Sequence, residues 1–200
     1  MNLYRMQDAD QRGYPYASGY GELSYPIPFL FGERLERRRE LWKVNPRPPG
    51  LLIDETGSKW GDFMLCGCGL PSVVYSERVL NSLKPLRHHM LTETEFPVGK
   101  IKSKKLRDVP PPRYYACQWG GGIEVDWHAT GVELDAHGNP ILPSNIPPRV
   151  AKLSTWNGDD IFSWINFEVS HLTMLCTERV VELAAKEKWT NVRFDPVPTS

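Results

Sequence analysis

The sequence predicts an α+β fold, in which a mixed, mostly antiparallel sheet or pair of sheets is flanked by a few helices. Apolar and polar residues alternate through Ile123–Trp127 and Val132–Asp135, which is typical of half-buried strands. Two other apolar runs, "VVYSERVL" (73–80) and "MLCTERVV" (174–181), lead straight into helical patterns. With 200 residues the chain is long enough to bury a substantial core.

The two similar phrases predict the same local structure. Each contains an apolar strand, a hydroxyl residue suited to cap a helix (Ser76 or Thr177), and a glutamate in the first turn, where the helix dipole favours an anion. The first helix should bury one side and stop at Lys84-Pro85, since proline removes a backbone donor. The residues expected on the buried sides are Val79, Leu80 and Leu83 in the first copy and Val180, Val181, Ala184 and Ala185 in the second.

The spacing of these phrases suggests a duplicated chain. An aspartate and an apolar pair precede both copies, as Asp62-Phe63-Met64 and Asp160-Ile161-Phe162. The second phrase follows the first after about half the chain, which favours two pseudo-symmetric strand–helix halves. The alternative is that unrelated strand–helix junctions use the same capping chemistry. We expect an N-terminal half over residues 1–112 and a C-terminal half over 113–200, forming one compact domain together.

The remaining segments give weaker patterns. The first 25 residues have no clear period and are predicted to wrap a surface or stay partly mobile. "FLFGERLERRRELWKV" (29–44) indicates an exposed amphipathic helix, and "NVRFDPV" (191–197) a closing strand with Val192 and Phe194 on one face. The basic run 100–107 leads into three prolines and is interpreted as a solvated hinge.

Composition disfavours several classes of partner. Lys and Arg number 24 against 24 Asp and Glu, so the net charge is zero and gives no general attraction to nucleic acid; a patch at 100–107 would need more basic surface around it. No stretch has the apolar core of a signal peptide or the length of a membrane span. We therefore expect a cytoplasmic protein with no membrane partner, and the sequence leaves its oligomeric state open.

Neither a metal site nor an active site is predicted. Cys66, Cys68, Cys117 and Cys176 sit in or beside apolar runs, which indicates buried free thiols, and "CGCG" lacks the two-residue spacing of a zinc knuckle. Asp126-x-His128, expected on one face of a strand, resembles a base with its orienting acid, but no nucleophile accompanies the pair. The prediction is no catalytic residue, no metal and no cofactor. A metal-binding or enzymatic module that uses Asp126 and His128 or the cysteines is the alternative.

Charge and aromatic residues concentrate in the second half. Between Trp119 and Glu168 there are seven acidic residues against two basic ones, with Trp119, Trp127, Trp156 and Trp164 among them. Acidic surfaces with aromatic anchors suit docking of a basic protein, while core tryptophans are the alternative. "GGG" at 120–122 lacks the Lys-Ser/Thr of a phosphate loop and indicates a flexible turn. The candidate partner-binding residues are Glu124, Asp126, Trp127, Glu133 and Asp135.

The C-terminal pattern "WNGDDIF…HLTMLCTERVVELAAKEKWTNVRFDPV" resembles the end of bacterial immunity proteins of the double-CXXCG type and of the related immunity-family-11 domain. "WGDFMLCGCGLPSVVYSERVLNSL" is similar to the middle of such proteins, so the resemblance covers about half the chain. The family's paired Cys-x-x-Cys-Gly elements are absent here, which argues against a zinc knuckle. The resemblance carries no catalytic residue and implies one partner, a cognate protein toxin that the chain binds and blocks inside the producing cell.

Overall fold

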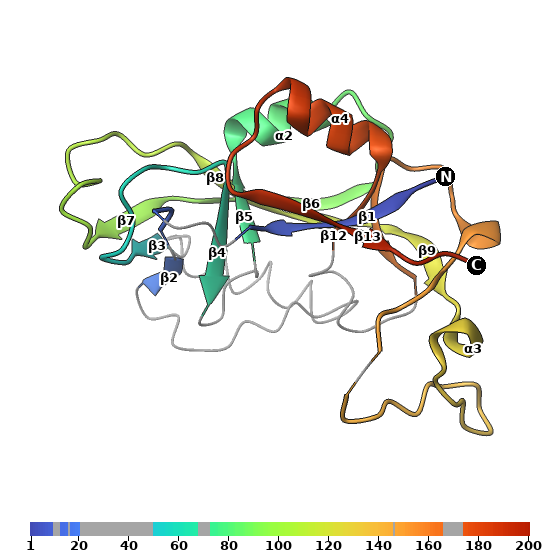
Figure 1. Ribbon diagram of the computed structural model, residues 1–200. Coiled ribbons are helices and arrows are strands. Elements are labelled where there is room, and N and C mark those ends of the chain that lie inside the picture. The colour runs from blue at the N-terminus through green and yellow to red at the C-terminus, as the bar shows by residue number, and fades with distance from the viewer. Residues whose placement is uncertain (10–12, 16, 21–49, 68–72, 146, 166–173) are drawn as a thin grey trace.

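A computed structural model describes residues 1–9, 13–15, 17–20, 50–67, 73–145, 147–165 and 174–200. Within these ranges the chain has the predicted α+β fold, with two mixed but mostly antiparallel sheets and short flanking helices (Figure 1). The helix expected over residues 29–44 lies outside the described residues.

Each sheet contains strands from both halves of the chain. The first sheet has the order β6-β8-β5-β4-β2-β3-β7. Its strands are β2 (Ala17–Tyr20), β3 (Gly50–Ile53), β4 (Phe63–Gly67), β5 (Val73–Ser76), β6 (Met90–Phe96), β7 (Val98–Ile101) and β8 (Tyr114–Trp119). The second sheet has the order β10-β9-β11-β12-β1-β13. Its strands are β1 (Leu3–Asp8), β9 (Gly121–Val125), β10 (Ala151–Lys152), β11 (Ile161–Trp164), β12 (Met174–Thr177) and β13 (Val192–Val197).

Two helices lie together on one side of the molecule, α2 (Glu77–Leu83) and α4 (Glu178–Lys186) (Figure 1). Their buried faces meet in one hydrophobic cluster, where Val79, Leu80 and Leu83 of α2 join Val180 and Ala184 of α4. Because both helices bury their apolar residues in the same core, the two halves are stabilised jointly. Shorter helical turns, α3 (Trp127–Thr130) and η1 (Leu153–Thr155), follow β9 and β10.

The predicted pseudo-symmetry is present and extends well beyond the two phrases. In the first copy, β2 pairs antiparallel with β3 and parallel with β4, and β4 pairs antiparallel with β5. In the second copy, β9 pairs in the same way with β10 and β11, and β11 with β12. Even the flanking hydrogen bonds correspond, because Leu51 N donates to Pro97 O over 2.8 Å as Ala151 N donates to Pro198 O over 2.7 Å. Seven strand and helix positions therefore repeat in the same chain order.

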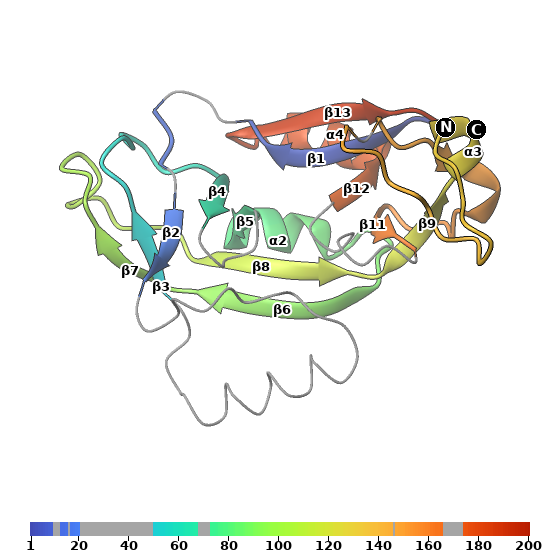
Figure 2. The same ribbon diagram turned by 90° about the horizontal axis from the view of Figure 1, so that it is seen from below.

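The two copies exchange their first strands. The strand between β5 and β6 is β8, which begins the second copy, and the strand between β12 and β13 is β1, which begins the first. Figure 2 shows β8 beside β6 in one layer and β1 beside β13 in the other. The expected N-terminal wrapping segment is thus wrong for Leu3–Asp8, since this segment is an internal strand of the second sheet with Leu3 and Met6 buried.

A buried aspartate joins the copies at each strand–helix junction. Asp62 accepts hydrogen bonds from Ser76 Oγ (2.8 Å) and from Thr190 N (2.8 Å), which lies after the helix of the other copy. Asp160 accepts correspondingly from Thr177 Oγ1 (2.9 Å) and from Arg87 N (3.1 Å).

An arginine in the first turn of each helix completes the arrangement. Arg78 pairs with Asp62, and Arg179 Nη1 lies 3.0 Å from Asp160 Oδ2. The repeated Asp…Ser/Thr-Glu-Arg pattern therefore encodes a crossed connection between the two copies.

Several local expectations need correction. Ser76 caps α2 as predicted, through a 3.4 Å bond from Val79 N. The Thr177 side chain makes no capping bond, although its hydroxyl donates to Asp160 as that of Ser76 donates to Asp62. Gly120–Gly122 is not a flexible turn: Gly121 and Gly122 begin β9. A Cβ on Gly122 would lie 2.6 Å from Phe162 Cβ, so glycine allows β9 to approach β11 closely.

Candidate partner-binding arm

The segment between β9 and β10 projects from the end of the second sheet as an arm, which we define as residues 131–145 and 147–149 (Figure 1). Val125 ends β9, and Asp126 then caps α3 by accepting a hydrogen bond from Ala129 N at 2.9 Å. Gly131 ends α3 with φ 76°, a left-handed conformation that costs glycine little, and so turns the chain outward.

The base of the arm is tied to the body by hydrogen bonds. Thr130 Oγ1 donates to Asp126 O (2.6 Å) and accepts from Val150 N (3.0 Å), which joins the outgoing and returning chains. Asp126 Oδ2 also accepts from Ser200 Oγ at 2.8 Å. The hydrogen bonds from Ala129 N and Ser200 Oγ lower the pKa of Asp126, so this carboxylate is engaged in holding the arm's base.

The tip of the arm is a tight turn organised by Asp135. Its Oδ1 accepts from His137 N and Asn139 N, both at 2.8 Å, and Gly138 adopts φ 81°. The backbone closes the turn through Asp135 N to Asn139 O and Ile141 N to Glu133 O, both 2.8 Å. Bonds from Asn139, through both its backbone and its side chain, lower the pKa of Asp135 most. The tip therefore has a defined shape although most of its side chains face solvent.

The arm exposes large apolar side chains. Leu134, Ile141 and Leu142 are 48%, 55% and 41% exposed, and they make up three of the six large apolar side chains that are exposed in the described ranges. Glu133, which precedes Leu134 in the chain, is also exposed. Exposed apolar surface commonly marks a site of protein association, so the presence of three such side chains on one short segment makes the arm the candidate site.

The five predicted contact residues divide between the arm and its base. Glu133 and Asp135 lie on the arm, whereas Glu124 is half-buried on β9 and Trp127 is half-buried in α3, packed against the cluster of Leu3, Ile123 and Phe162. Asp135 acts within the turn as well as contributing charge. Sequence reasoning did not identify Leu134, Ile141 and Leu142 as exposed contact residues. The alternation at Val132–Leu134 predicted a half-buried strand, in which Leu134 would be buried. The structure buries Val132 but gives Leu134 only an isolated bridge to Pro140.

The four tryptophans of the second half differ in exposure. Trp119 and Trp164 are 2% and 3% exposed and belong to the core, which was one of the two interpretations of the sequence. Trp156 is also half-buried, with its Nε1 donating to Asp159 O at 3.0 Å. Of these four tryptophans, Trp127 is the one that was predicted to contact a partner.

The strand premise of the alternative acid–base pair is also wrong. Asp126 precedes α3 and His128 lies within it, so the two side chains are not neighbours on one strand face. His128 is exposed, and the Asp126 carboxylate is occupied by Ala129 N and Ser200 Oγ.

Cys117 and Cys176 are free thiols in apolar surroundings. Burial raises the pKa of the Cys117 thiol to about 12 and moves that of Cys176 in the same direction. Thiolates are the species that attack and that bind metals, so these two side chains are poorly suited to either chemistry at neutral pH. Cys66 is buried as well, while Cys68 lies outside the described residues. Within the described ranges, no three His, Cys, Asp or Glu side chains converge on a potential metal site.

Comparisons with known proteins add no relative: no protein-family model matches the chain, and no curated protein matches it. Across the part of the chain that the structure describes, no helix is both long enough and apolar enough to cross a bilayer.

Proposed function

We propose that this protein is an immunity protein that binds a cognate bacterial toxin in the cytoplasm and neutralises it by stoichiometric inhibition. The observation that carries the proposal is the arm, which presents Leu134, Ile141 and Leu142 to solvent beside Glu133. The C-terminal sequence pattern resembles that of immunity proteins, which supports the same function independently of the arm.

The arm has the properties of a preorganised binding element. Its tip is held by the Asp135 carboxylate and its base by Thr130, so little conformational freedom remains to be lost when a partner binds. The three apolar side chains would supply most of the binding free energy once buried, and the carboxylates would favour a partner with a basic surface. A projecting element of this kind suits insertion into a concave site on the toxin.

The proposal is tested with the polypeptide encoded by the adjacent gene. Co-expression should restore growth of cells that produce this polypeptide, and the two purified proteins should form a stable complex in size-exclusion chromatography. Absence of a complex, with the neighbouring polypeptide shown to be toxic, would overturn the proposed function.

The arm is tested separately by substitution. Changing Leu134, Ile141 and Leu142 together to serine should weaken the complex at least tenfold, because apolar contacts at the centre of an interface carry most of its free energy. Leu91→Ser is the matched control, since Leu91 is 40% exposed on β6, outside the arm. A triple variant that binds and protects as well as the wild type would remove the arm from the interface while leaving the function itself standing.

Charge is tested at one position that plays no part in the turn. Glu133→Lys should slow association with a basic toxin and reduce the dependence of the association rate on salt. Asp135 is unsuitable for this purpose because its carboxylate holds the tip.

A further inference from the structure

Strand β7 and the loop that follows it carry a run of basic side chains. Figures 1 and 2 both place β7 at the opposite end of the molecule from α3 and the arm. Residues 98–109 contain a single carboxylate, Asp108, against five cations, all of which are exposed: Lys100, Lys102, Lys104, Lys105 and Arg107. Because the protein as a whole has no net charge, positive charge is concentrated at this end.

The backbone of this loop is anchored, although the sequence predicted a solvated hinge. Ser103 and Leu106 are buried; Ser103 Oγ donates to Gly57 O and accepts from Leu106 N at 3.3 Å. Farther along, Val109 O accepts from Trp60 Nε1 at 3.1 Å. None of these anchoring contacts uses a charged side chain. The fold therefore holds the loop in place without its lysines, which remain free to meet a ligand.

The anchoring brings a sixth cation to this end. Lys59 is exposed in the connection between β3 and β4, the same connection that contacts the loop through Gly57 and Trp60. Its Nζ lies 4.3 Å from the centre of the Tyr14 ring, which is a cation–π contact. Local sequence does not show this proximity, because Lys59 is distant from the basic run along the chain. We define the basic end as Lys59, Lys100, Lys102, Lys104, Lys105 and Arg107.

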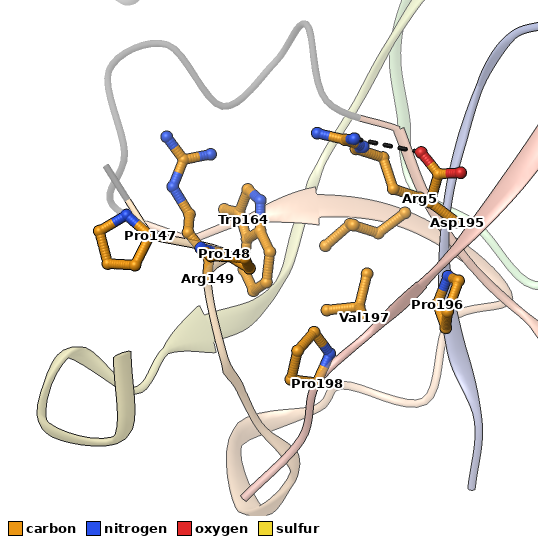
Figure 3. Close-up of a pocket in the computed structure, with 10 residues that line it drawn as sticks. Arg5, Pro147, Pro148, Arg149, Trp164, Asp195, Pro196, Val197 and Pro198 are labelled. Atoms are coloured by element: carbon orange, nitrogen blue, oxygen red, sulfur yellow. Dashed lines mark hydrogen bonds and ion pairs between the residues drawn. The ribbon is translucent and has the colours of Figure 1, made fainter. Parts of the chain in front are cut away.

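The basic end differs from other basic positions in that none of its cations forms an ion pair with a carboxylate of the described residues. Arginines elsewhere are paired, as Arg179 is with Asp160. Figure 3 shows another example in a pocket on the second sheet, where Arg5 Nη2 lies 3.2 Å from Asp195 Oδ2. The two segments that form the basic end hold three carboxylates against its six cations, namely Asp54, Glu55 and Asp108. An excess of positive charge is therefore left.

We infer that the basic end binds the phosphate backbone of a nucleic acid. Lys102 N donates to Ile53 O at 2.9 Å, so the chain remains extended beyond β7. Lys100 and Lys102 therefore lie on the same side, about 7 Å apart. A row of exposed cations suits a ligand with regularly repeated negative charges. The half-buried Trp60 and Tyr14 accompany the cations, and aromatic rings among basic residues are typical of surfaces that bind unpaired bases.

A protein surface or a lipid surface fits this end less well. Protein interfaces depend on aromatic and apolar anchors, and lipid surfaces on apolar side chains that insert between headgroups. Among the described residues of these segments, Val109 is the large apolar side chain that is exposed, at 46%, whereas the arm exposes three. The inference stands apart from the proposed function, because the arm lies at the other end of the molecule and either can fail without the other.

Fluorescence anisotropy with the full chain tests the inference. The probes are a labelled thymidine oligomer of about 20 nucleotides, longer than the usual single-stranded site, and a labelled duplex of the same length. We expect at least one to bind with a dissociation constant of about 1–100 μM at 0.1 M salt. Raising the salt from 50 to 200 mM should increase this constant about 100-fold, as expected when about five phosphates release counterions.

The comparison of probes separates the kinds of ligand. Binding of the single strand alone identifies unpaired bases as part of the ligand, and binding of the duplex alone identifies the regular backbone; either result supports the inference. Polyglutamate and vesicles of phosphatidylcholine and phosphatidylglycerol (3:1) are the other anions. No binding of either nucleic acid, or equally tight binding of polyglutamate or of the vesicles, overturns the inference.

Variants locate the binding. Lys100→Glu/Lys102→Glu should weaken it at least tenfold at 0.1 M salt. Lys152→Glu/Lys186→Glu is the matched control, since it changes the net charge equally at exposed positions of β10 and α4, and it should weaken binding less than threefold. Thermal unfolding establishes that each variant is folded, and Lys100→Gln/Lys102→Gln replaces the first variant if it is not. Equal weakening by the two pairs would mean that net charge alone is responsible, and overturns the inference.

Discussion

Asp62 and Asp160 are the residues at which the two copies of the fold are joined, and their partners define what each carboxylate contributes. Both are buried, and both accept hydrogen bonds from their own strand–helix junction and from the segment that follows the other helix. Burial by itself would raise the pKa of Asp62, but the donors Arg78, Thr190 and Ser76 together hold it below the ordinary value of 3.8. The carboxylate is therefore stabilised as an anion in the folded protein.

Asp62→Asn should lower the free energy of unfolding at pH 7 by about 2–4 kcal/mol, because an amide presents donors to groups that are themselves donors. Since folding lowers the pKa of Asp62, its contribution is complete above about pH 5 and is lost progressively as pH falls through 3.8 toward the lower pKa of the folded state. The difference between variant and wild type should therefore shrink in acid. Urea denaturation at pH 7 and at pH 3 measures this, with the exposed Asp108→Asn as control. A difference that is independent of pH would contradict the assignment.

Ser76 and Thr177 occupy equivalent positions but act differently. Ser76→Ala should cost about 1–2 kcal/mol, through loss of both the cap to Val79 N and the bond to Asp62. Thr177→Val should cost a similar amount although no cap is lost, because buried Asp160 loses a donor. Thr177→Ser should restore stability. Thermal unfolding measures all three, and a neutral Thr177→Val would show that the Asp160 bond is of no consequence.

At the scale of elements, β9 and the arm that follows it should differ in how well they tolerate amino-acid substitutions. The strand is held close to β11, with Ile165 N donating to Ile123 O over 2.7 Å and Ser163 N to Gly120 O over 2.9 Å. Residues 133–145 of the arm, in contrast, are exposed apart from the half-buried Pro140. Changes in the strand should therefore reduce stability, and changes in the arm should reduce binding.

Gly122→Ala should destabilise the protein by about 1–3 kcal/mol, because its Cβ would lie 2.6 Å from Phe162 Cβ and 2.9 Å from Asn157 Oδ1. Gly138→Ala in the arm meets no atom within 4 Å and should cost only about 1 kcal/mol, through its positive φ. Chemical denaturation of the two variants compares them directly. Equal costs would mean that β9 can move away from β11 without penalty.

Replacing residues 133–141 by two glycines should leave the free energy of unfolding within about 1 kcal/mol of the wild type, since these side chains are largely solvated. Under the proposed function, the shortened protein should lose binding to the toxin at the same time. Circular dichroism and thermal unfolding measure the first effect, and size-exclusion chromatography with the toxin measures the second. Large destabilisation would indicate that the arm supports the fold.

At the scale of the whole molecule, the exchange of β1 and β8 makes each sheet depend on both halves of the chain. Residues 1–112 contain β5 and β6 but lack the strand that lies between them, and residues 113–200 lack the strand between β12 and β13. Both gaps fall inside a sheet, where the unpaired backbone groups of two strands would be exposed at once.

Fragments 1–112 and 113–200 should therefore each remain largely unfolded, and mixing them should restore the native circular dichroism spectrum and a 1:1 complex. The boundary lies between β7 and β8, so no strand of the structure is cut. Size-exclusion chromatography and circular dichroism of each fragment and of the mixture are the measurements. A fragment that folds cooperatively alone would show that the exchanged strand is dispensable.

Local sequence was most informative where local chemistry decides the structure. The two strand–helix junctions, the stop at Lys84-Pro85 and the closing strand at Val192–Val197 all followed from capping, proline and periodicity. The proposed partner-binding arm could be predicted only in part: Glu133 and Asp135 stood out by charge, whereas the alternation at Leu134 indicated burial that does not occur.

By itself, the sequence determined where each of the two helices begins, because hydroxyl caps, acidic first turns and apolar spacing act between near neighbours. It suggested a duplication, which the matching strand pairings of the two copies support. Only the tertiary structure decided which strand completes which sheet, since the pairing of β1 with β12 and of β8 with β5 joins segments whose local patterns do not specify a partner. It likewise decided that Trp119 and Trp164 are buried while Leu134 is exposed, because burial depends on what packs against a residue and not on the residue alone.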